Sequence, residues 1–241
     1  MTAVYPTSTF TTSMLGASSR RRVETESMNG MAYRRLKEKI ITVELPPASL
    51  IDEGSLAAEL QMGLTPVRQA LRRLALENLV VILPRRGTIV ADVNISDLHK
   101  IFEMRQELEP LASSLAAQRA TPSQIAEMHE LAVQVRDTTA SQEIGQLLRF
   151  DQRMHMSLWQ AAHNEFLEET LDRLYNHVLR LWNLSPIQTA SVQQAMEDHL
   201  TVFEAVARRD VEQAAGLMRV HVSRFQERVL QMYTVGAWAP L

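Results

Sequence analysis

Apolar residues recur at helical spacing along most of the chain. Met31, Leu36 and Ile40 fall on one stripe of a predicted helix over 28–43, with basic residues on its other faces. The proline pair that begins at Pro46 ends this helix, because proline lacks the N–H that helix continuation needs. The same periodicity predicts further helices over 53–61, 66–78, 95–119, 122–138, 143–162, 165–182, 190–208 and 211–232.

Capping residues mark where several of these helices begin. Thr65 is expected to be the N-cap of the third helix, with Pro66 at its first position, where a missing N–H costs nothing. Thr121 precedes a proline in the same way, and Asp210 is the expected N-cap of the last helix. Further caps are expected at Ile95–Asp97, opening the long helix, and at Asn164, as a left-handed C-cap.

Two β-rich runs follow the third helix. Val80–Leu83 and Thr88–Val90 flank a turn that contains Gly87, which is typical of a β-hairpin. Three helices followed by a hairpin predict a winged helix-turn-helix. The remaining helices predict an antiparallel bundle, so the expected fold is mostly α.

This pattern divides the chain into four segments. We expect a disordered arm at 1–27, because it is rich in Ser and Thr and lacks helical periodicity. The winged helix-turn-helix is expected at 28–92, the helical domain at 96–232 and a tail at 233–241.

Composition narrows the possible settings and chemistry. The 241 residues include no cysteine, which excludes disulfides and thiolate metal sites. No apolar run approaches the roughly 20 residues of a membrane span, and no secretory signal is evident. We therefore expect a soluble cytoplasmic protein without a membrane partner.

Charge is distributed unevenly between the two halves. Residues 1–92 carry 12 Lys and Arg against 9 Asp and Glu, whereas residues 93–241 carry 13 against 19. A basic head on an acidic body favours nucleic-acid binding by the head, although ordinary surface ion pairs are the alternative. The candidate DNA contacts on the third helix and the wing are Thr65, Arg68, Arg72, Arg73, Arg85, Arg86 and Gly87.

A set of histidines and one aspartate suggests a metal site in the helical domain. Asp151 and His155 are four residues apart, so they share one helix face. His199 and His221 lie in two successive predicted helices, which bring both side chains to the same space if they run antiparallel. Imidazole and carboxylate ligands suit zinc first, with nickel, manganese or iron as alternatives. Partly buried or surface histidines without metal are the alternative interpretation.

The head resembles GntR-family transcription regulators. The resemblance lies in Thr65-Pro-Val-Arg68-Gln-Ala-Leu71, followed by Pro84 and Arg86-Gly87-Thr88. The family usually has Ser-Arg-Thr-Pro-Val-Arg-Glu-Ala-Leu at the first motif. Leu64 stands where the family has a DNA-contacting arginine, and Gln69 replaces the glutamate.

The helical region resembles the FCD sensor domain of the FadR subfamily. Asp151, His155, Asn164, His199 and His221 follow the order and spacing of that domain. The resemblance implies a divalent metal bound by the Asp and three His, a small organic-acid effector and a homodimer. It also implies that Arg105 lines the effector pocket, whereas a salt bridge with Glu109, four positions on, is the alternative.

Together these observations predict a ligand-responsive DNA-binding transcription regulator, and a repressor released by a carboxylate effector is the commoner behaviour in the resembled family. A metal-dependent helical enzyme such as a hydrolase is the main alternative, since a catalytic metal also keeps an open position. A protein-interaction module with a structural ion is the third.

Overall fold

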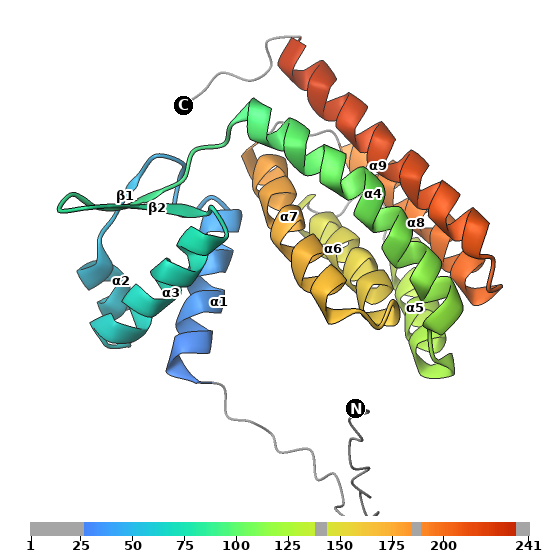
Figure 1. Cartoon of the computed structure of the whole chain (residues 1–241), viewed down its shortest axis with the longest axis horizontal. Helices are drawn as coiled ribbons and strands as arrows, with labels where there is room; N and C mark the ends of the chain where they lie inside the picture. The colour runs from blue at the N-terminus through green and yellow to red at the C-terminus, as the bar shows by residue number, and fades with distance from the viewer. Residues whose placement is uncertain (1–26, 138–143, 185–188, 235–241) are drawn as a thin grey trace, which may run out of the picture.

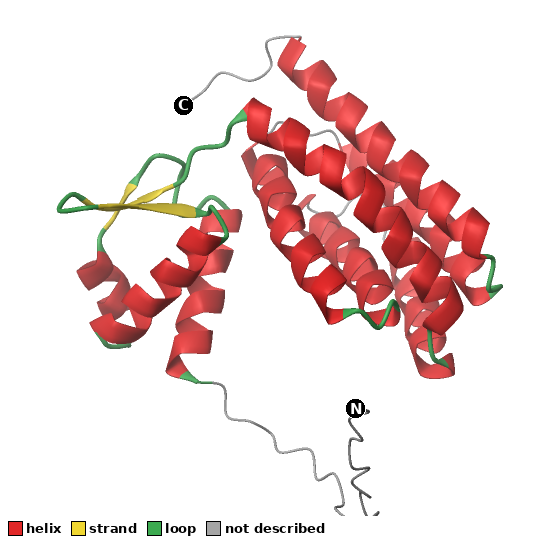
Figure 2. Cartoon of the chain, viewed as in Figure 1, coloured by secondary structure: helices red, strands yellow, loops and turns green. Residues whose placement is uncertain are grey.

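The structure is a computed structural model that describes residues 27–137, 144–184 and 189–234. The head contains α1 (Met28–Ile41), α2 (Glu53–Glu59), α3 (Leu64–Leu76), β2 (Val80–Leu83) and β3 (Gly87–Val90). Figures 1 and 2 show the two hairpin strands projecting beside the three helices as a wing. The predicted winged helix-turn-helix is therefore confirmed.

The head also contains a strand that the hydrophobic pattern did not reveal. β1 (Leu50–Ile51) pairs antiparallel with β3, with Leu50 opposite Ile89 and Ile51 opposite Thr88. The sheet order is β1-β3-β2. A strand of two residues is too short to show an alternating pattern, and it exists only because a distant strand pairs with it.

The core of the head lies mainly between α1 and α3. Leu36 and Ile40 of α1 are buried, as the helical stripe predicted, and they belong to the same hydrophobic cluster as Leu71 and Leu74 of α3. This packing leaves the opposite face of α3 in solvent, so that face is available for contact with another molecule.

Two helix starts differ from the prediction. Gly63, with φ −72° and ψ 163°, is the N-cap of α3, so Leu64, Thr65 and Pro66 form the first turn. The expected N-cap role of Thr65 is wrong, because proline is tolerated throughout a first turn and does not mark one fixed position.

The bundle begins with α4 (Ile95–Arg119), whose N-cap is Asn94 rather than the expected segment 95–97. The Asn94 side chain accepts a hydrogen bond from the Ser96 N–H at 2.8 Å. The other helices are α5 (Pro122–Arg136), α6 (Ile144–Ala161), α7 (Glu165–Leu184), α8 (Thr189–Ala207) and α9 (Val211–Thr234). α4 lies along α9 in Figure 1.

The remaining caps are partly as expected. Thr121 forms a capping box with Gln124, and Asp210 accepts from the Gln213 N–H at 3.0 Å, so both predicted starts are confirmed. Asn164 is not the left-handed residue. His163 has φ 48°, and Asn164 instead accepts from the Leu167 N–H at the start of α7.

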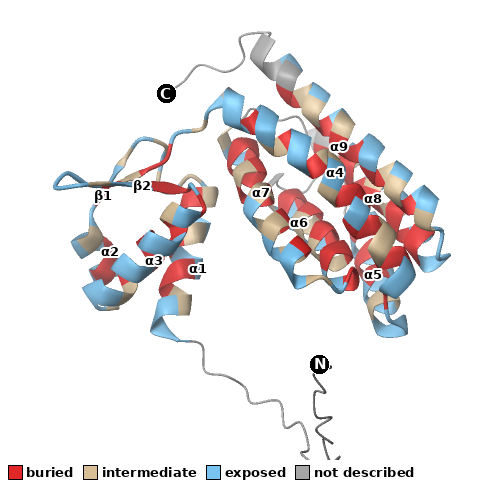
Figure 3. Ribbon diagram, viewed as in Figure 1, coloured by how far each residue is buried: buried red, intermediate tan, exposed pale blue. Residues whose placement is uncertain are grey.

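Burial follows the helix faces, with buried residues turned inward and exposed residues outside, as Figure 3 shows. A second hydrophobic cluster, separate from that of the head, fills the bundle. The expected mostly α fold, a winged head joined to a helical bundle, is confirmed. No described helix is long and apolar enough to cross a membrane.

Two expected terminal segments lie almost wholly outside the described residues, namely the arm at 1–27 and the tail at 233–241. Only their inner edges are described. Ser27 is the N-cap of α1, its side chain accepting from the Gly30 N–H at 3.1 Å, and α9 extends to Thr234.

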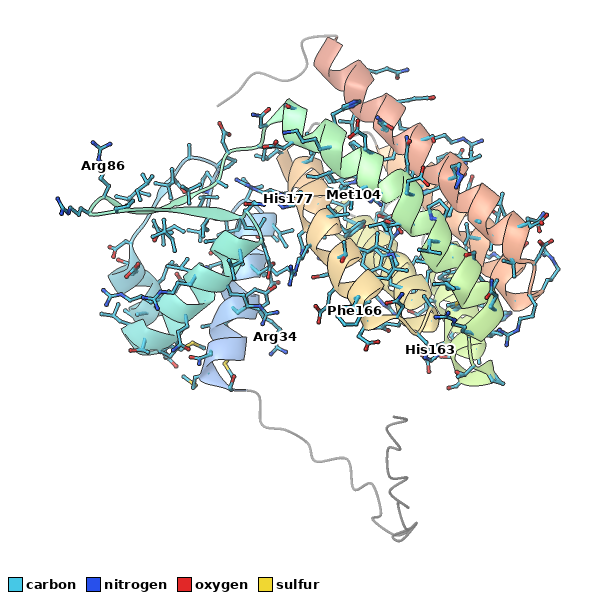
Figure 4. The ribbon with its side chains drawn as sticks, viewed as in Figure 1. Arg34, Arg86, Met104, His163, Phe166 and His177 are labelled. Atoms are coloured by element: carbon cyan, nitrogen blue, oxygen red, sulfur yellow. The ribbon has the colours of Figure 1, made fainter. Side chains whose placement is uncertain are left out.

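Polar side chains of α7 join the bundle to the head. His177 Nε2 donates to the Glu77 carbonyl oxygen at 2.9 Å, and Arg180 Nη2 donates to the Ala91 carbonyl oxygen. Lys37 of α1 forms an ion pair of 2.7 Å with an α7 carboxylate. Figure 4 shows His177 at this junction. α7 therefore forms hydrogen bonds with the head at two places, the C-terminal end of α3 and the segment after β3.

Candidate metal centre and nucleic-acid interface

Three helices bring the four predicted ligands together inside the bundle. Asp151 and His155 come from α6, His199 from α8 and His221 from α9. All four side chains are buried, and one ligand atom from each lies within 4.8 Å of the others. The antiparallel arrangement expected for α8 and α9 is what brings the last two histidines to the same space.

Hydrogen bonds orient two of the imidazoles. His155 Nδ1 lies 3.1 Å from Glu109 Oε2, and His199 Nδ1 lies 2.8 Å from the Ala195 carbonyl oxygen. Since both partners are acceptors, each Nδ1 carries the proton and donates. The Nε2 atom of each ring is then left as the electron-pair donor, which is how metal-binding histidines are usually held.

Several polar atoms of this centre are buried without a partner. Among the described residues, Asp151 Oδ1, His199 Nε2 and His221 Nδ1 form no hydrogen bond. His221 Nδ1 lies 3.8 Å from Asp198 Oδ2, which is too far for one. Each unsatisfied buried polar atom costs about 1–3 kcal/mol. Since one ligand atom of each of the four residues lies within 4.8 Å of the others, one cation could contact all four side chains, and the residues fit a metal ion.

The electrostatics favour the protonation states that ligate metals. Burial raises the pKa of Asp151, but the three facing imidazoles outweigh it and hold that pKa below its usual value. Burial and the neighbouring imidazoles hold the pKa of His199 well below its usual value, and burial also lowers the pKa of His221. The lowered pKa values of Asp151, His199 and His221 favour the deprotonated ligands that a divalent ion requires.

A second layer of buried groups supports the ligands. Glu109 accepts from Arg105 Nη2 at 2.7 Å, from Trp159 Nε1 at 2.8 Å and from His155. Burial raises the pKa of Glu109, but His155 and Arg105 outweigh it and lower that pKa. The hydroxyl of Tyr175 donates to Asp151 Oδ2. The sequence predicted Glu109 only as a possible salt-bridge partner of Arg105, and it did not reveal Tyr175 or Trp159 as parts of the centre.

Arg105 lies inside this centre rather than on the surface. Its side chain is only 2% exposed, it is paired with Glu109, and its Nη2 is 3.5 Å from His155 Nε2. Arg105 lines the same small cavity as Asp151 and His221, with a volume of about 10 Å³. That space holds an ion or a water and no organic molecule, so an effector at this centre requires the helices to move apart.

The exposed face of α3 and the tip of the wing form the candidate nucleic-acid interface. Thr65, Arg68 and Arg72 are exposed and spaced so that they share one helix face. Arg68 Nε is held by Glu53 Oε2 of α2 at 2.7 Å. This ion pair holds the Arg68 guanidinium beside the start of α3.

The wing tip presents two arginines in a tight turn. Arg85, with φ 63°, and Arg86 are exposed, and Gly87 takes φ 101°, a conformation that favours glycine. Figure 4 shows Arg86 at the end of the wing, directed away from the bundle. Both arginine side chains are therefore available to contact a partner of the head.

Arg73, also expected on the nucleic-acid interface, lies elsewhere. Its guanidinium carbon is 3.7 Å from the centre of the Tyr33 ring, and its Nε is 3.6 Å from Glu77 Oε1. Arg73 therefore turns toward α1 and the junction with the bundle, one helix position away from the face that carries Arg72.

A winged helix-turn-helix head with exposed arginines, bonded to a bundle that encloses a candidate metal centre, defines a DNA-binding transcriptional regulator with its own sensor domain. The chain belongs to the gntR family of bacterial regulatory proteins, whose model matches residues 29–90, and residues 100–224 match the FCD domain. Regulators of this family bind DNA operators, and their FCD domains bind small-molecule effectors.

Curated relatives agree with this assignment, and a solved structure shares the fold. The Nta operon transcriptional regulator of Aminobacter aminovorans is 26% identical over 193 residues, covering 80% of this chain and 90% of its own. The HTH-type transcriptional repressor RspR of Escherichia coli K12 is 24% identical over 208 residues, covering 86% and 91%. The structure of E. coli McbR/YncC superposes with a TM-score of 0.76 at 23% identity, covering 87% of this chain and all of that one.

These matches decide between the functions considered from the sequence. The matched families and the named relatives are all transcriptional regulators, so the chain is not an enzyme of the metal-dependent hydrolase kind. The buried ligand cluster consequently belongs to a sensor domain.

Proposed function

We propose that this protein is a metal-containing repressor, acting as a homodimer in the cytoplasm, that leaves its operator when a small carboxylate binds the FCD bundle. The observation that carries the proposal is the buried cluster of four ligand residues, three of which have an unsatisfied polar atom. The name of the relative RspR, a transcriptional repressor, supports the direction of control.

The residues that would hold the ion are Asp151, His155, His199 and His221. One carboxylate and three imidazoles suit zinc first, with nickel, manganese or iron also compatible. A bound divalent ion would supply a positive charge that attracts an oxygen anion inside a low-dielectric bundle. Arg105 would supply the second positive charge, and its existing partner Glu109 keeps it in place.

Operator contacts are assigned to the face formed by α3 and the wing. In the helix-turn-helix mode, the N-terminal residues of the recognition helix approach base edges in the major groove. Arg68 and Arg72 would read bases or phosphates there, together with Thr65. Arg85, Arg86 and the backbone at Gly87 would contact the sugar-phosphate backbone. Contact by Arg73 would require it to leave the Tyr33 ring.

α7 supplies a continuous path from the centre to the head. Tyr175 of α7 donates to the ligand carboxylate of Asp151, while His177 and Arg180 of the same helix donate to head carbonyl oxygens. A shift of α7 that opens the small cavity around the centre would therefore also displace the head.

Two measurements on the purified protein test the proposal. Operator sequences are first selected from random duplex DNA, and metal content is measured by plasma mass spectrometry. We expect sequence-specific DNA binding and one divalent ion per chain, which the double variant His199→Ala/His221→Ala loses. The matched control is His129→Ala, an exposed histidine of α5. Unchanged metal content in the double variant would refute the ligand assignment, and the absence of any selected sequence would refute the operator.

A further inference from the structure

A much larger cavity than the metal centre lies at the junction of the head and the bundle. It has a volume of about 550 Å³ and is lined by residues of α1, α3, α6 and α7. The cavity at the metal centre measures about 10 Å³. Of these two cavities, the junction cleft alone has room for an organic molecule in this arrangement of the helices.

Basic side chains outnumber acidic ones around this cleft. Arg34, Lys37, Arg73 and Arg149 line it, against the carboxylates of Glu38 and Asp172. Asp172 is already paired with Lys37 at 2.7 Å, and Arg73 is 3.6 Å from the buried Glu77. Arg149 is exposed at the mouth of the cleft. This balance favours a bound anion.

A buried amide beside the cleft has a hydrogen-bond acceptor without a partner in the part of the chain that the structure describes. Asn176 of α7 lines the cleft and is 1% exposed. Its Nδ2 donates to Asp172 Oδ2 at 3.2 Å, which fixes the orientation of the amide, because a carboxylate only accepts. Asn176 Oδ1 is then a buried acceptor with no partner among the described residues. A hydrogen-bond donor supplied by water or by a molecule bound beside Asn176 would satisfy it.

The remaining walls of the cleft are partly apolar. Ile41 of α1, Leu148 of α6 and Leu179 of α7 line it, together with Tyr33. We propose that the junction cleft is a second ligand site, for a small organic anion that has an apolar ring and a hydroxyl or amine donor. The arginines and lysine bind the anionic group, Asn176 accepts from the donor, and the apolar side chains cover the ring.

A ligand in this site touches the head and the bundle at once, so it changes how α1 and α3 sit on α7. By linkage, a ligand that prefers one arrangement changes operator affinity, and DNA changes ligand affinity by the same factor. This inference goes beyond the proposed effector at the metal centre and requires no metal. It rests only on the DNA-binding function of the head.

The test uses 8-anilinonaphthalene-1-sulfonate, which combines an anion, an N–H donor and aromatic rings, and whose fluorescence rises in apolar surroundings. We expect one saturable site per full-length chain, with displacement by 4-hydroxybenzoate. Asn176→Leu, which removes the unsatisfied acceptor, and Gly145→Trp, which fills the cleft, should each weaken binding at least tenfold. A Cβ added at Gly145 meets nothing nearer than Arg149 Nη1, at 3.8 Å, so the backbone at this position has room for a side chain to begin.

Matched controls separate this site from the metal centre. Gly145→Ala and the double variant His199→Ala/His221→Ala should bind the dye as the wild type does, and 4-hydroxybenzoate should alter the operator affinity of both. Wild-type dye affinity in both Asn176→Leu and Gly145→Trp would overturn the proposal. Loss of dye binding in the histidine double variant alone would also overturn it, because the dye would then bind at the metal centre. The proposed function would remain intact in that case.

Discussion

At the residue scale, the carboxylate of Glu109 holds the candidate centre together. It accepts hydrogen bonds from Arg105, His155 and Trp159, and all four side chains are buried. Removing the negative charge leaves Arg105 as an unpaired charge in the core, which is among the most costly changes a folded protein can undergo. It also releases the His155 ring from the orientation that presents Nε2 to the other ligands.

Glu109→Gln tests this role. We expect a loss of stability of about 3–5 kcal/mol by denaturant unfolding, and a 10–100-fold loss of metal affinity in competition with a chelator. Glu107→Gln, on the exposed face of the same helix, is the control and should change neither quantity. If the two variants behave alike, Glu109 does not support the centre.

His177 predicts a pH dependence at the junction. Burial holds the pKa of this histidine below the usual 6.5, and its hydrogen bond to the Glu77 carbonyl only partly opposes that effect. As the pH falls below 6.5, the unfolded chain takes up a proton at His177 before the folded chain does. The free energy of unfolding therefore falls as the pH drops below 6.5. It stops falling once the pH reaches the lower pKa of His177 in the folded protein.

The measurement is urea unfolding of the metal-free protein between pH 7.5 and 5.5, for the wild type and His177→Gln. We expect the wild type to lose stability faster, by up to about 1.4 kcal/mol per pH unit for one proton. The glutamine retains a donor for Glu77 but does not titrate. If the unfolding free energies of the two proteins change with pH in the same way, folding does not lower the pKa of His177.

At the element scale, helices with a strong apolar stripe could be predicted from the sequence, whereas elements that depend on distant partners could not. Leu36 and Ile40 define α1 by themselves. In contrast, Leu50 and Ile51 form a strand only because β3 pairs with them. The N-cap role predicted for Thr65 is wrong because a threonine followed by proline fits an N-cap and a first turn equally well.

The candidate centre likewise contains some residues that the sequence could predict and others that it could not. Asp151 and His155 could be identified because both lie on one helix at a spacing of four, and His199 and His221 by their order and spacing. Glu109 and Tyr175 could not, because α4 and α7 meet α6 only in the folded bundle. A charged residue in the middle of a buried helix was the available signal for Glu109.

Helix α3 and the wing carry the DNA prediction. Arg68→Ala should weaken operator binding by roughly 1–3 kcal/mol if it reads a base, and should lower the salt slope by about one if it contacts a phosphate. Fluorescence anisotropy at several salt concentrations measures both quantities. Arg219→Ala, on the exposed surface of α9, is the matched control. Wild-type affinity and salt slope in Arg68→Ala would exclude α3 as the recognition helix.

At the scale of the whole molecule, α7 connects the sensor to the head. Arg180 is 1% exposed and donates to the Ala91 carbonyl oxygen, and burial lowers its pKa to about 10. We expect Arg180→Met to retain metal content and operator binding, because it changes neither site, but to reduce the response of operator affinity to an effector. If the response in this variant is as large as in the wild type, coupling does not depend on this contact.

We propose that the FCD bundle controls the operator affinity of the winged head through the centre of Asp151, His155, His199 and His221. The most direct measurement is operator affinity, titrated by anisotropy with and without acetate, lactate, succinate and malate, in the wild type and in His199→Ala/His221→Ala. We predict that at least one acid weakens operator binding 5–150-fold, the usual range of allosteric coupling, in the wild type only. An acid that binds the centre tightly in the wild type and leaves operator affinity unchanged would contradict the account.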